Sequence, residues 1–95
     1  MISVTGPLWL WAGESGAWHF ISVPPELSDE IRAHAMIALR GFGSVRVAVT
    51  IGDVTWRTSV FPVKEGGYIL PVKAEIRRKT SIAAGDEVTV ELELL

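Results

Sequence analysis

The residues that could do chemistry in this chain are few. There is no cysteine, which excludes disulfides, thiolate nucleophiles and cysteine-based metal sites. His19 and His34 are the only histidines, and they lie in different predicted elements with no carboxylate at ligand spacing, so we expect no metal site. No serine lies in a Gly-x-Ser-x-Gly elbow, and no glycine loop of the phosphate-cradling type is present. We therefore expect no catalytic residue set and no cofactor.

Arg46, Arg57 and Ser59 are the candidate ligand-binding residues. In the hairpin register derived below, Arg46 faces Ser59, and both guanidinium groups lie on the face opposite a row of valines. Two forked donors on one face could hold a small anionic ligand, such as a carboxylate or a phosphate. The structural alternative, which we favour, is a solvated sheet face with ion pairs to Glu91 or Glu93 on a neighbouring strand.

Two Gly-Asp pairs are interpreted as structural turns. Gly52-Asp53 separates two alternating runs, and Gly85-Asp86 precedes the last one. A glycine adopts positive φ without strain, and an aspartate side chain bonds nearby backbone N–H groups. A catalytic role for Asp86 would need a partner group, and the sequence offers none.

Trp9 and Trp11 are the candidate interface residues. They fall on one face of a predicted strand and Leu8 and Leu10 on the other, so this segment is apolar on both faces. One explanation is that the core covers one face and a helix covers the other. The alternative is a contact surface, because exposed aromatic patches mark interfaces. Since two-fold pairing is the commonest arrangement of soluble oligomers, we expect a symmetric homodimer through this segment.

The charge balance bears on the other partners. Nine Lys plus Arg against eleven Asp plus Glu give a formal charge of −2, which argues against bulk attraction to nucleic acid or to an anionic membrane. The one basic run, Arg77-Arg78-Lys79, already complements a predicted helix C-terminus, and nucleic-acid binding would need a wider basic stripe. No apolar run approaches the roughly 20 residues of a membrane helix, and no signal peptide is apparent. We expect a cytoplasmic protein.

A hairpin over residues 45–61 is the clearest element that must position these residues. Apolar and polar residues alternate before and after Gly52-Asp53, a two-residue turn signal. Pairing Ile51 with Val54 puts eight side chains on one face. The four predicted pairs are Ile51 with Val54, Val49 with Trp56, Val47 with Thr58, and Val45 with Val60.

Two further strand regions flank this hairpin in the sequence. The run from Asp86 to Leu94 alternates cleanly, with Val88, Val90, Leu92 and Leu94 on one side. Near the N-terminus, the runs 8–11 and 18–21 flank Gly13-Glu14-Ser15-Gly16, which predicts a second hairpin.

Two segments are predicted to be helical. The longer helix follows Pro24-Pro25, is capped by Ser28, and runs from Asp29 to Arg40 before stopping at Gly41. Its expected buried stripe is Leu27, Ile31, Ala35, Ala38 and Leu39. The shorter helix spans Val72 to Lys79, after Pro71.

The order of short motifs resembles the bacterial domain-of-unknown-function family DUF1905 over nearly the whole chain. The motifs, in order, are Trp18-His19-Phe20-Ile21-Ser22-Val23-Pro24, Gly41-Phe42-Gly43-Ser44-Val45-Arg46-Val47, Trp56-Arg57-Thr58-Ser59-Val60-Phe61-Pro62, Gly67-Tyr68-Ile69-Leu70-Pro71-Val72-Lys73, then Arg77 and Ile82-Ala83-Ala84-Gly85-Asp86-Glu87-Val88. The resemblance implies a small β-barrel with short helices, and it implies no established activity.

A second, local likeness lies in residues 70–90. Leu70-Pro71, Ile76-Arg77 and Ile82-x-x-Gly85-Asp86-x-Val88 are similar to the swapped-hairpin domains of the AbrB type, which bind DNA as dimers. Pro71 lies two residues farther from Arg77 than that motif has it, and the valine hairpin has no counterpart there. We attribute the likeness to a shared way of building a barrel.

These observations predict a mainly β fold, a small β-barrel of about six strands with one or two short helices, in a single domain over residues 1–95. We expect an uncharacterised bacterial domain that works as a non-catalytic binding or interaction module. A DNA-binding regulator or antitoxin of the AbrB type is the alternative, and an unrecognised enzyme is the third interpretation.

Overall fold

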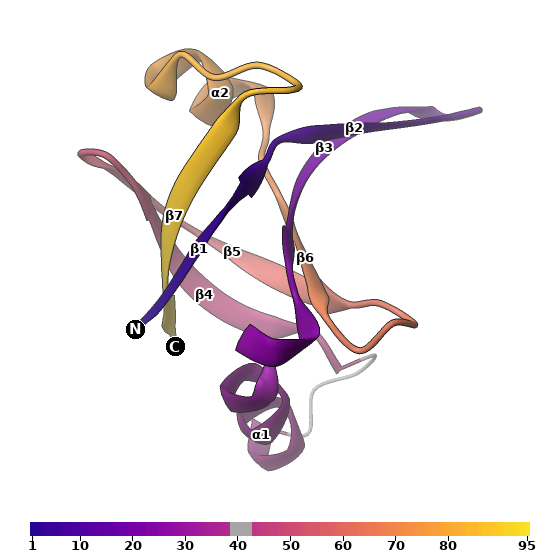
Figure 1. Ribbon diagram of the computed structural model, residues 1–95, viewed down its shortest axis with the longest axis vertical. Coiled ribbons are helices and arrows are strands. Elements are labelled where there is room, and N and C mark those ends of the chain that lie inside the picture. Colours follow the sequence, from indigo (N-terminus) through magenta and orange to yellow (C-terminus); the bar gives the residue numbers. More distant parts are fainter. Residues whose placement is uncertain (39–42) are drawn as a thin grey trace.

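The computed structural model describes residues 1–38 and 43–95. Both ranges contribute strands to one antiparallel sheet (Figure 1). Within these residues seven strands follow the order β1-β7-β4-β5-β6-β3-β2. The strands are β1 (Ile2–Pro7), β2 (Trp9–Gly13), β3 (Gly16–Val23), β4 (Val45–Ile51), β5 (Val54–Pro62), β6 (Tyr68–Pro71) and β7 (Glu87–Leu94). The other described elements are a 3-10 turn, η1 (Pro25–Leu27), and the helices α1 (Asp29–Ala38) and α2 (Ala74–Thr80).

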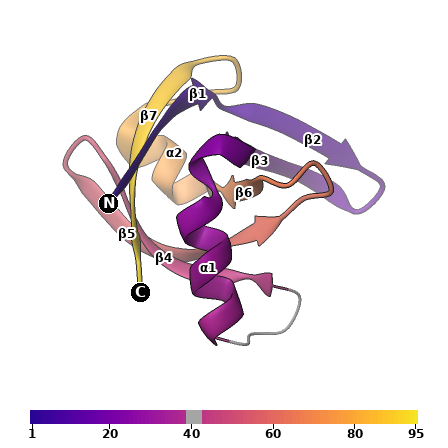
Figure 2. The same ribbon diagram turned by 60° about the horizontal axis from the view of Figure 1, so that its bottom comes forward.

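The sheet curls into a half-barrel whose two edges are β1 and β2. In Figure 1, α1 lies at the lower end of the half-barrel and α2 at the upper end. Figure 2 shows α1 across the lower opening. The prediction of a mainly β, barrel-like fold with short helices is confirmed. The barrel stays open because no strand pairing in the described residues joins β1 to β2.

The β4–β5 hairpin has the predicted register at every pair, from Val45 opposite Val60 to Ile51 opposite Val54. Four of its inward valines, Val45, Val47, Val49 and Val60, are buried, and Trp56 is only 9% exposed. Gly52 has a φ of 60°, which a two-residue turn between paired strands requires of its first position. The alternation of apolar residues therefore determines both the register and the buried face.

Strand β1 was not predicted. Ile2 and Val4 are buried, whereas Ser3 and Thr5 point outward and are exposed. Along the outer face Thr5 forms a hydroxyl–hydroxyl hydrogen bond of 2.8 Å with Thr89 of β7. The alternation is present but short, and β1 becomes a strand because β7 pairs with it along its whole length.

The Gly85-Asp86 turn is fastened to Leu8, the residue between β1 and β2. The Leu8 amide donates to the Asp86 carbonyl at 2.9 Å, and the Gly85 amide donates to the Leu8 carbonyl at 2.8 Å. Gly85 has a φ of 95°, and the Asp86 carboxylate accepts from the Ala83 amide at 2.9 Å. The Asp86 side chain thus bonds a nearby backbone amide, as the interpretation of Gly85-Asp86 as a structural turn predicts.

Helix α1 departs from its predicted stripe at Leu27. That side chain is 40% exposed, because it lies in η1, ahead of the helix and out of phase with it. Ile31 is fully buried and Ala35 packs against the core, as expected. The side chain of Ala38, and residues 39–41 with the predicted end of the helix, lie outside the described residues.

The start of α1 is tied to the turn before it. The Ser28 carbonyl accepts from the Arg32 amide at 2.9 Å, as at a helix start. Its hydroxyl donates to the Pro24 carbonyl at 2.8 Å, so the side chain predicted to cap the helix stabilises the preceding turn.

Helix α2 begins at Ala74, two residues later than predicted. The amide of Val72 donates to the His19 carbonyl of β3 at 2.9 Å, so the chain still belongs to the sheet at that position. This contact sets where α2 stands relative to β3. The candidate site depends on that placement.

Candidate functional site

The β2–β3 hairpin projects beyond the rest of the sheet (Figure 1). Strand β6 pairs with β3 only from Phe20 to Val23. The outer part of β3, from Gly16 to Trp18, pairs only with β2. Residues 10–18 are all exposed, so this outer part lacks the covering layer that the central strands have.

Aromatic side chains cover one face of this hairpin. Trp9 stands opposite Phe20 and Trp11 opposite Trp18. The Trp9 and Phe20 ring centroids lie 5.1 Å apart, and the Trp18 and Phe20 rings are stacked at 6.5 Å. Trp11 is 49% exposed and Trp18 is 56% exposed. The sheet thus presents a row of aromatic rings to solvent.

Glycine at position 13 lets the Trp11 ring lie along the strand. A Cβ atom at Gly13 would overlap the six-membered ring of Trp11. At the other end of the row, the Trp9 indole N–H donates to the Ser22 hydroxyl at 2.9 Å. Both ends of the aromatic row are therefore positioned by local contacts.

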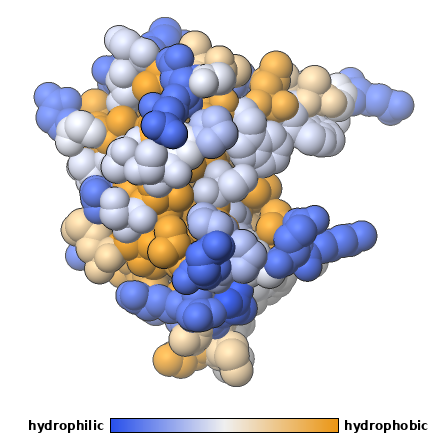
Figure 3. Space-filling model, in the orientation of Figure 1, coloured by the Kyte–Doolittle hydropathy of each residue, from blue (hydrophilic) through white to orange (hydrophobic). Residues whose placement is uncertain are grey.

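The neighbouring strands extend this row into a concave surface, the aromatic hollow. Phe20 stands opposite Pro71 of β6, and Phe61 of β5 stands opposite Ile69. The hollow has a volume of about 420 Å³, and its lining residues are Trp11, Trp18, Phe20, Phe61, Ile69 and Pro71. Figure 3 shows the molecule hollowed on its right side, between two projections with hydrophilic tips. These projections correspond to the β2–β3 turn and the β5–β6 loop of Figure 1.

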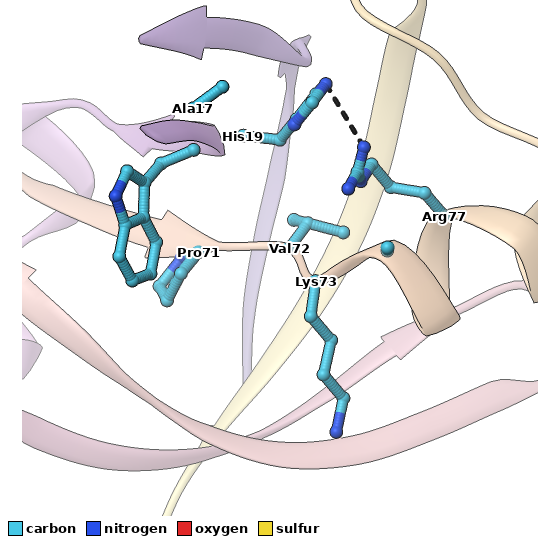
Figure 4. Close-up of a pocket in the computed structure, with 8 residues that line it drawn as sticks. Ala17, His19, Pro71, Val72, Lys73 and Arg77 are labelled. Atoms are coloured by element: carbon cyan, nitrogen blue, oxygen red, sulfur yellow. Dashed lines mark hydrogen bonds between the residues drawn. The ribbon is translucent and has the colours of Figure 1, made fainter. Parts of the chain in front are cut away.

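A second cavity, the basic pocket, lies between β3 and α2 (Figure 4). Its volume is about 250 Å³, and its lining residues are Ala17, Trp18, His19, Pro71, Val72, Lys73, Ala74 and Arg77. In Figure 4 the His19 and Arg77 side chains point toward each other and the Lys73 side chain runs away from them. His19 Nε2 and Arg77 Nη1 lie 3.2 Å apart.

The chemistry of this pair fixes the protonation of His19. A guanidinium can only donate, so His19 Nε2 must accept and the imidazole is neutral. Burial and, secondarily, the positive charge of Arg77 hold the pKa of His19 below its ordinary value of 6.5. The two residues lie 58 positions apart, and nothing in their sequence context pointed to the contact.

Arg46, Arg57 and Ser59 lie where the register placed them. Arg46 stands opposite Ser59 and Arg57 opposite Ala48, and both arginines are exposed. In residues 1–38 and 43–95 neither arginine forms an ion pair, so the expected pairs with Glu91 and Glu93 are absent there. Arg57 borders a small pocket with Trp18, Trp56 and Pro71, which adjoins the aromatic hollow, and Arg46 does not line it.

Trp9 and Trp11 have different environments. Trp9 is partly buried by Phe20 and bonded to Ser22, whereas Trp11 lines the hollow. Trp18 and Phe20, which were not singled out as site residues, complete the row. Their signal was present in the sequence, since they lie opposite Trp11 and Trp9 in the predicted hairpin.

The geometry defines this protein as a half-barrel with an apolar hollow on its outer face. The chain belongs to the family described as domain of unknown function, DUF1905, whose family model matches residues 5–92. The predicted resemblance is thereby confirmed. A search of curated proteins found no match to the chain.

Among residues 1–38 and 43–95, no three histidine or acidic side chains lie close enough together to hold a metal ion. No helix in the same residues has the length and apolar character needed to cross a membrane.

Proposed function

We propose that this DUF1905 domain is a non-catalytic binding module and that the aromatic hollow is its ligand surface. The observation that carries the proposal is the exposure of Trp11, Trp18 and Phe61 around one concavity, at 49%, 56% and 42%. Burying apolar surface is favourable by about 25 cal/mol of free energy per Å². Large apolar side chains that stay in water do not contribute this free energy. Contiguous exposed apolar surface of this kind marks binding sites.

The shape and lining of the hollow favour a planar apolar group as its occupant. Its volume of about 420 Å³ falls in the range of small-molecule sites, roughly 300–1,000 Å³. Stacked aromatic rings on one wall offer a planar ligand offset-stacked or edge-to-face contacts. None of the six lining side chains is an acid, a base or a nucleophile, which supports binding rather than catalysis.

DNA binding through the basic run has less support. Arg77 is turned toward His19, and Lys79 lies 3.4 Å from the Glu75 carboxylate. Of the three cations in Arg77-Arg78-Lys79, Arg77 thus lies inside a pocket and Lys79 is paired with a carboxylate. A DNA-binding surface would need these cations on an open face where they can meet phosphates.

A second copy of this chain is the competing occupant of the hollow. The outer edge of β2 is unpaired in the described sheet, and Trp11 beside it is exposed. A symmetric dimer would bury this edge and the aromatic row together. We retain the homodimer as a second proposal, which light scattering tests.

Titration with 2-naphthalenemethanol, an uncharged planar aromatic probe, tests the proposed ligand surface. Amide NMR shifts should saturate and map to β2, β3, β5 and β6, and Trp18→Ala should weaken binding about tenfold, the equivalent of 1.4 kcal/mol. Ile37→Ser on α1 is the control, because Ile37 is an exposed apolar residue that does not line the hollow. Non-saturating shifts, or equal weakening by both variants, would contradict the proposal.

A further inference from the structure

Arg77 is an arginine whose charge lacks a counter-charge. No carboxylate pairs with it in residues 1–38 and 43–95. Its Nε atom is buried without a hydrogen-bond partner there, and Nη1 is directed at a neutral imidazole. Leaving a buried donor unsatisfied is unfavourable, and more so when the donor belongs to a charged group.

The surrounding elements hold Arg77 in this position. Ile76, its neighbour on α2, is buried in the core, and the Arg77 carbonyl accepts from the Ile82 amide at 3.1 Å after the helix ends. Across the pocket, the His19 carbonyl is fixed by the Val72 amide. The guanidinium therefore cannot escape its environment by a simple movement of the helix.

The other charged groups around the basic pocket leave it positive. Its lining includes Lys73 and Arg77 but no acidic residue. The Glu75 carboxylate, which does not line the pocket, is shared between Lys73 at 3.7 Å and Lys79 at 3.4 Å. Lys73 therefore has a counter-charge outside the pocket, and Arg77 does not.

We infer that the basic pocket binds a small carboxylate, with the carboxylate group on the Arg77 guanidinium and an apolar remainder against the uncharged walls. A carboxylate would supply the missing counter-charge, since a guanidinium pairs with it through two parallel hydrogen bonds. The apolar walls are Ala17, Pro71, Val72 and Ala74. They select an organic acid over a bare, strongly hydrated oxyanion.

His19 gives this site a second property. When a carboxylate occupies Arg77, Nε2 of His19 is released from accepting the Arg77 N–H and faces a negative charge. A nearby negative charge favours the imidazolium, so the bound carboxylate raises the pKa of His19. By linkage, the carboxylate binds more tightly as the pH falls through the range in which His19 gains its proton. The charged residues that line the pocket beside His19 are Lys73 and Arg77.

Sodium benzoate is the probe for this site, titrated at constant ionic strength and followed by amide NMR. Saturable shifts at Ala17, His19 and Val72 are expected, and Arg77→Gln should weaken binding at least about tenfold, as for the loss of a charged hydrogen bond. Arg78→Gln is the matched control, because it removes the same charge from an exposed neighbour on the same helix. It should change the affinity less than about twofold, the scale of a screened surface charge.

Two further probes distinguish a carboxylate site from a purely apolar cavity and from a general anion site. Benzyl alcohol has the ring without the charge and should bind far more weakly than benzoate. Inorganic phosphate has the charge without the ring and should also bind more weakly. Equal weakening by Arg77→Gln and Arg78→Gln, or binding of either probe as tight as that of benzoate, would overturn the carboxylate assignment.

Two readouts keep the test valid if Arg77→Gln folds poorly. Arg77→Lys retains the charge but not the fork, and it should still weaken benzoate binding. In the wild type, the NMR titration of the His19 ring should shift to higher pH when benzoate is bound. An unchanged His19 titration with benzoate bound would exclude the pocket. Because 2-naphthalenemethanol carries no carboxylate, its binding to the aromatic hollow can fail or succeed independently.

Discussion

Two hairpins of this half-barrel differ in their place in the sheet and in how their faces are covered. The β4–β5 hairpin lies in the middle of the sheet, with β7 on one side and β6 on the other. The β2–β3 hairpin lies at the edge, and its outer half has no further strand beside it. In the first, one face is buried and the other is polar. In the second, both faces are apolar and only one belongs to the core.

This difference shows when the alternation of apolar residues predicts the buried face of a hairpin and when it does not. Where one face of a hairpin is polar, the buried face follows from the pattern alone. Where both faces are apolar, the pattern does not indicate which face is buried, and the excess apolar surface remains exposed. In this domain the excess falls on Trp11, Trp18 and Phe20.

The largest expected difference in stability between the two hairpins comes from replacing one tryptophan in each. Trp56→Ala should lower the free energy of unfolding by about 3–5 kcal/mol, because a large buried side chain leaves a cavity. Trp18→Ala should cost under about 1 kcal/mol, because its ring is already more than half exposed. Urea denaturation of the two variants measures both values. Similar losses would mean that the edge hairpin is as tightly packed as the central one.

Glycine substitutions give the next largest effect. A Cβ at Gly67 would overlap the backbone carbonyl of Val23, whereas one at Gly13 would meet only the movable ring of Trp11. Gly67→Ala should therefore cost about 1–3 kcal/mol, as overpacking does, and Gly13→Ala under about 1 kcal/mol. Thermal unfolding ranks the two. A more destabilising Gly13→Ala would show that the hairpin tip is rigid.

Self-association tests whether the edge hairpin meets a second copy. Light scattering at micromolar concentration should give the mass of a dimer for the wild type, and Trp11→Ser should raise the dissociation constant about tenfold, or 1.4 kcal/mol. Met36→Ser, also on exposed surface but on α1, is the control. A wild type that stays monomeric at all concentrations would leave the small apolar ligand as the one occupant proposed for the hollow.

The smallest effect is expected on the outer face of the central hairpin. Arg57→Ala should change the free energy of unfolding by under about 1 kcal/mol, since the side chain is exposed and forms no ion pair in the described residues. Chemical denaturation beside Trp56→Ala is the measurement. A loss comparable to that of Trp56→Ala would reverse the assignment of the two faces.

Most of the sheet could be predicted from the sequence because its central strands alternate cleanly. The register of the hairpin from Val45 to Val60 follows from local alternation and one turn. The strand from Val88 to Leu92 follows from alternation alone. Strand β1 could not be recognised with the same rule, because Ile2 and Val4 give two apolar positions and their partners, Leu92 and Val90, lie at the far end of the chain. This segment forms a strand because it pairs with β7, which is distant in the sequence.

The candidate site was predictable in part for a related reason. The aromatic row follows from one hairpin, so Trp9 and Trp11 pointed to it. The pairing of His19 with Arg77 depends on where α2 meets β3, and that depends on the Val72 contact with His19. A single hydrogen bond between distant segments leaves no periodic trace in a sequence.

The position of β7 between β1 and β4 has a consequence for how the domain is made. During synthesis, β1 and β4 cannot pair with β7 until β7 has been made. This half of the sheet can close only after translation has passed residue 94. The same arrangement brings the two ends of the chain side by side (Figure 1). A circular permutant that joins them by a short linker and opens the exposed Glu14-Ser15 turn would deliver β7 and β1 together, and it should close this part of the sheet sooner.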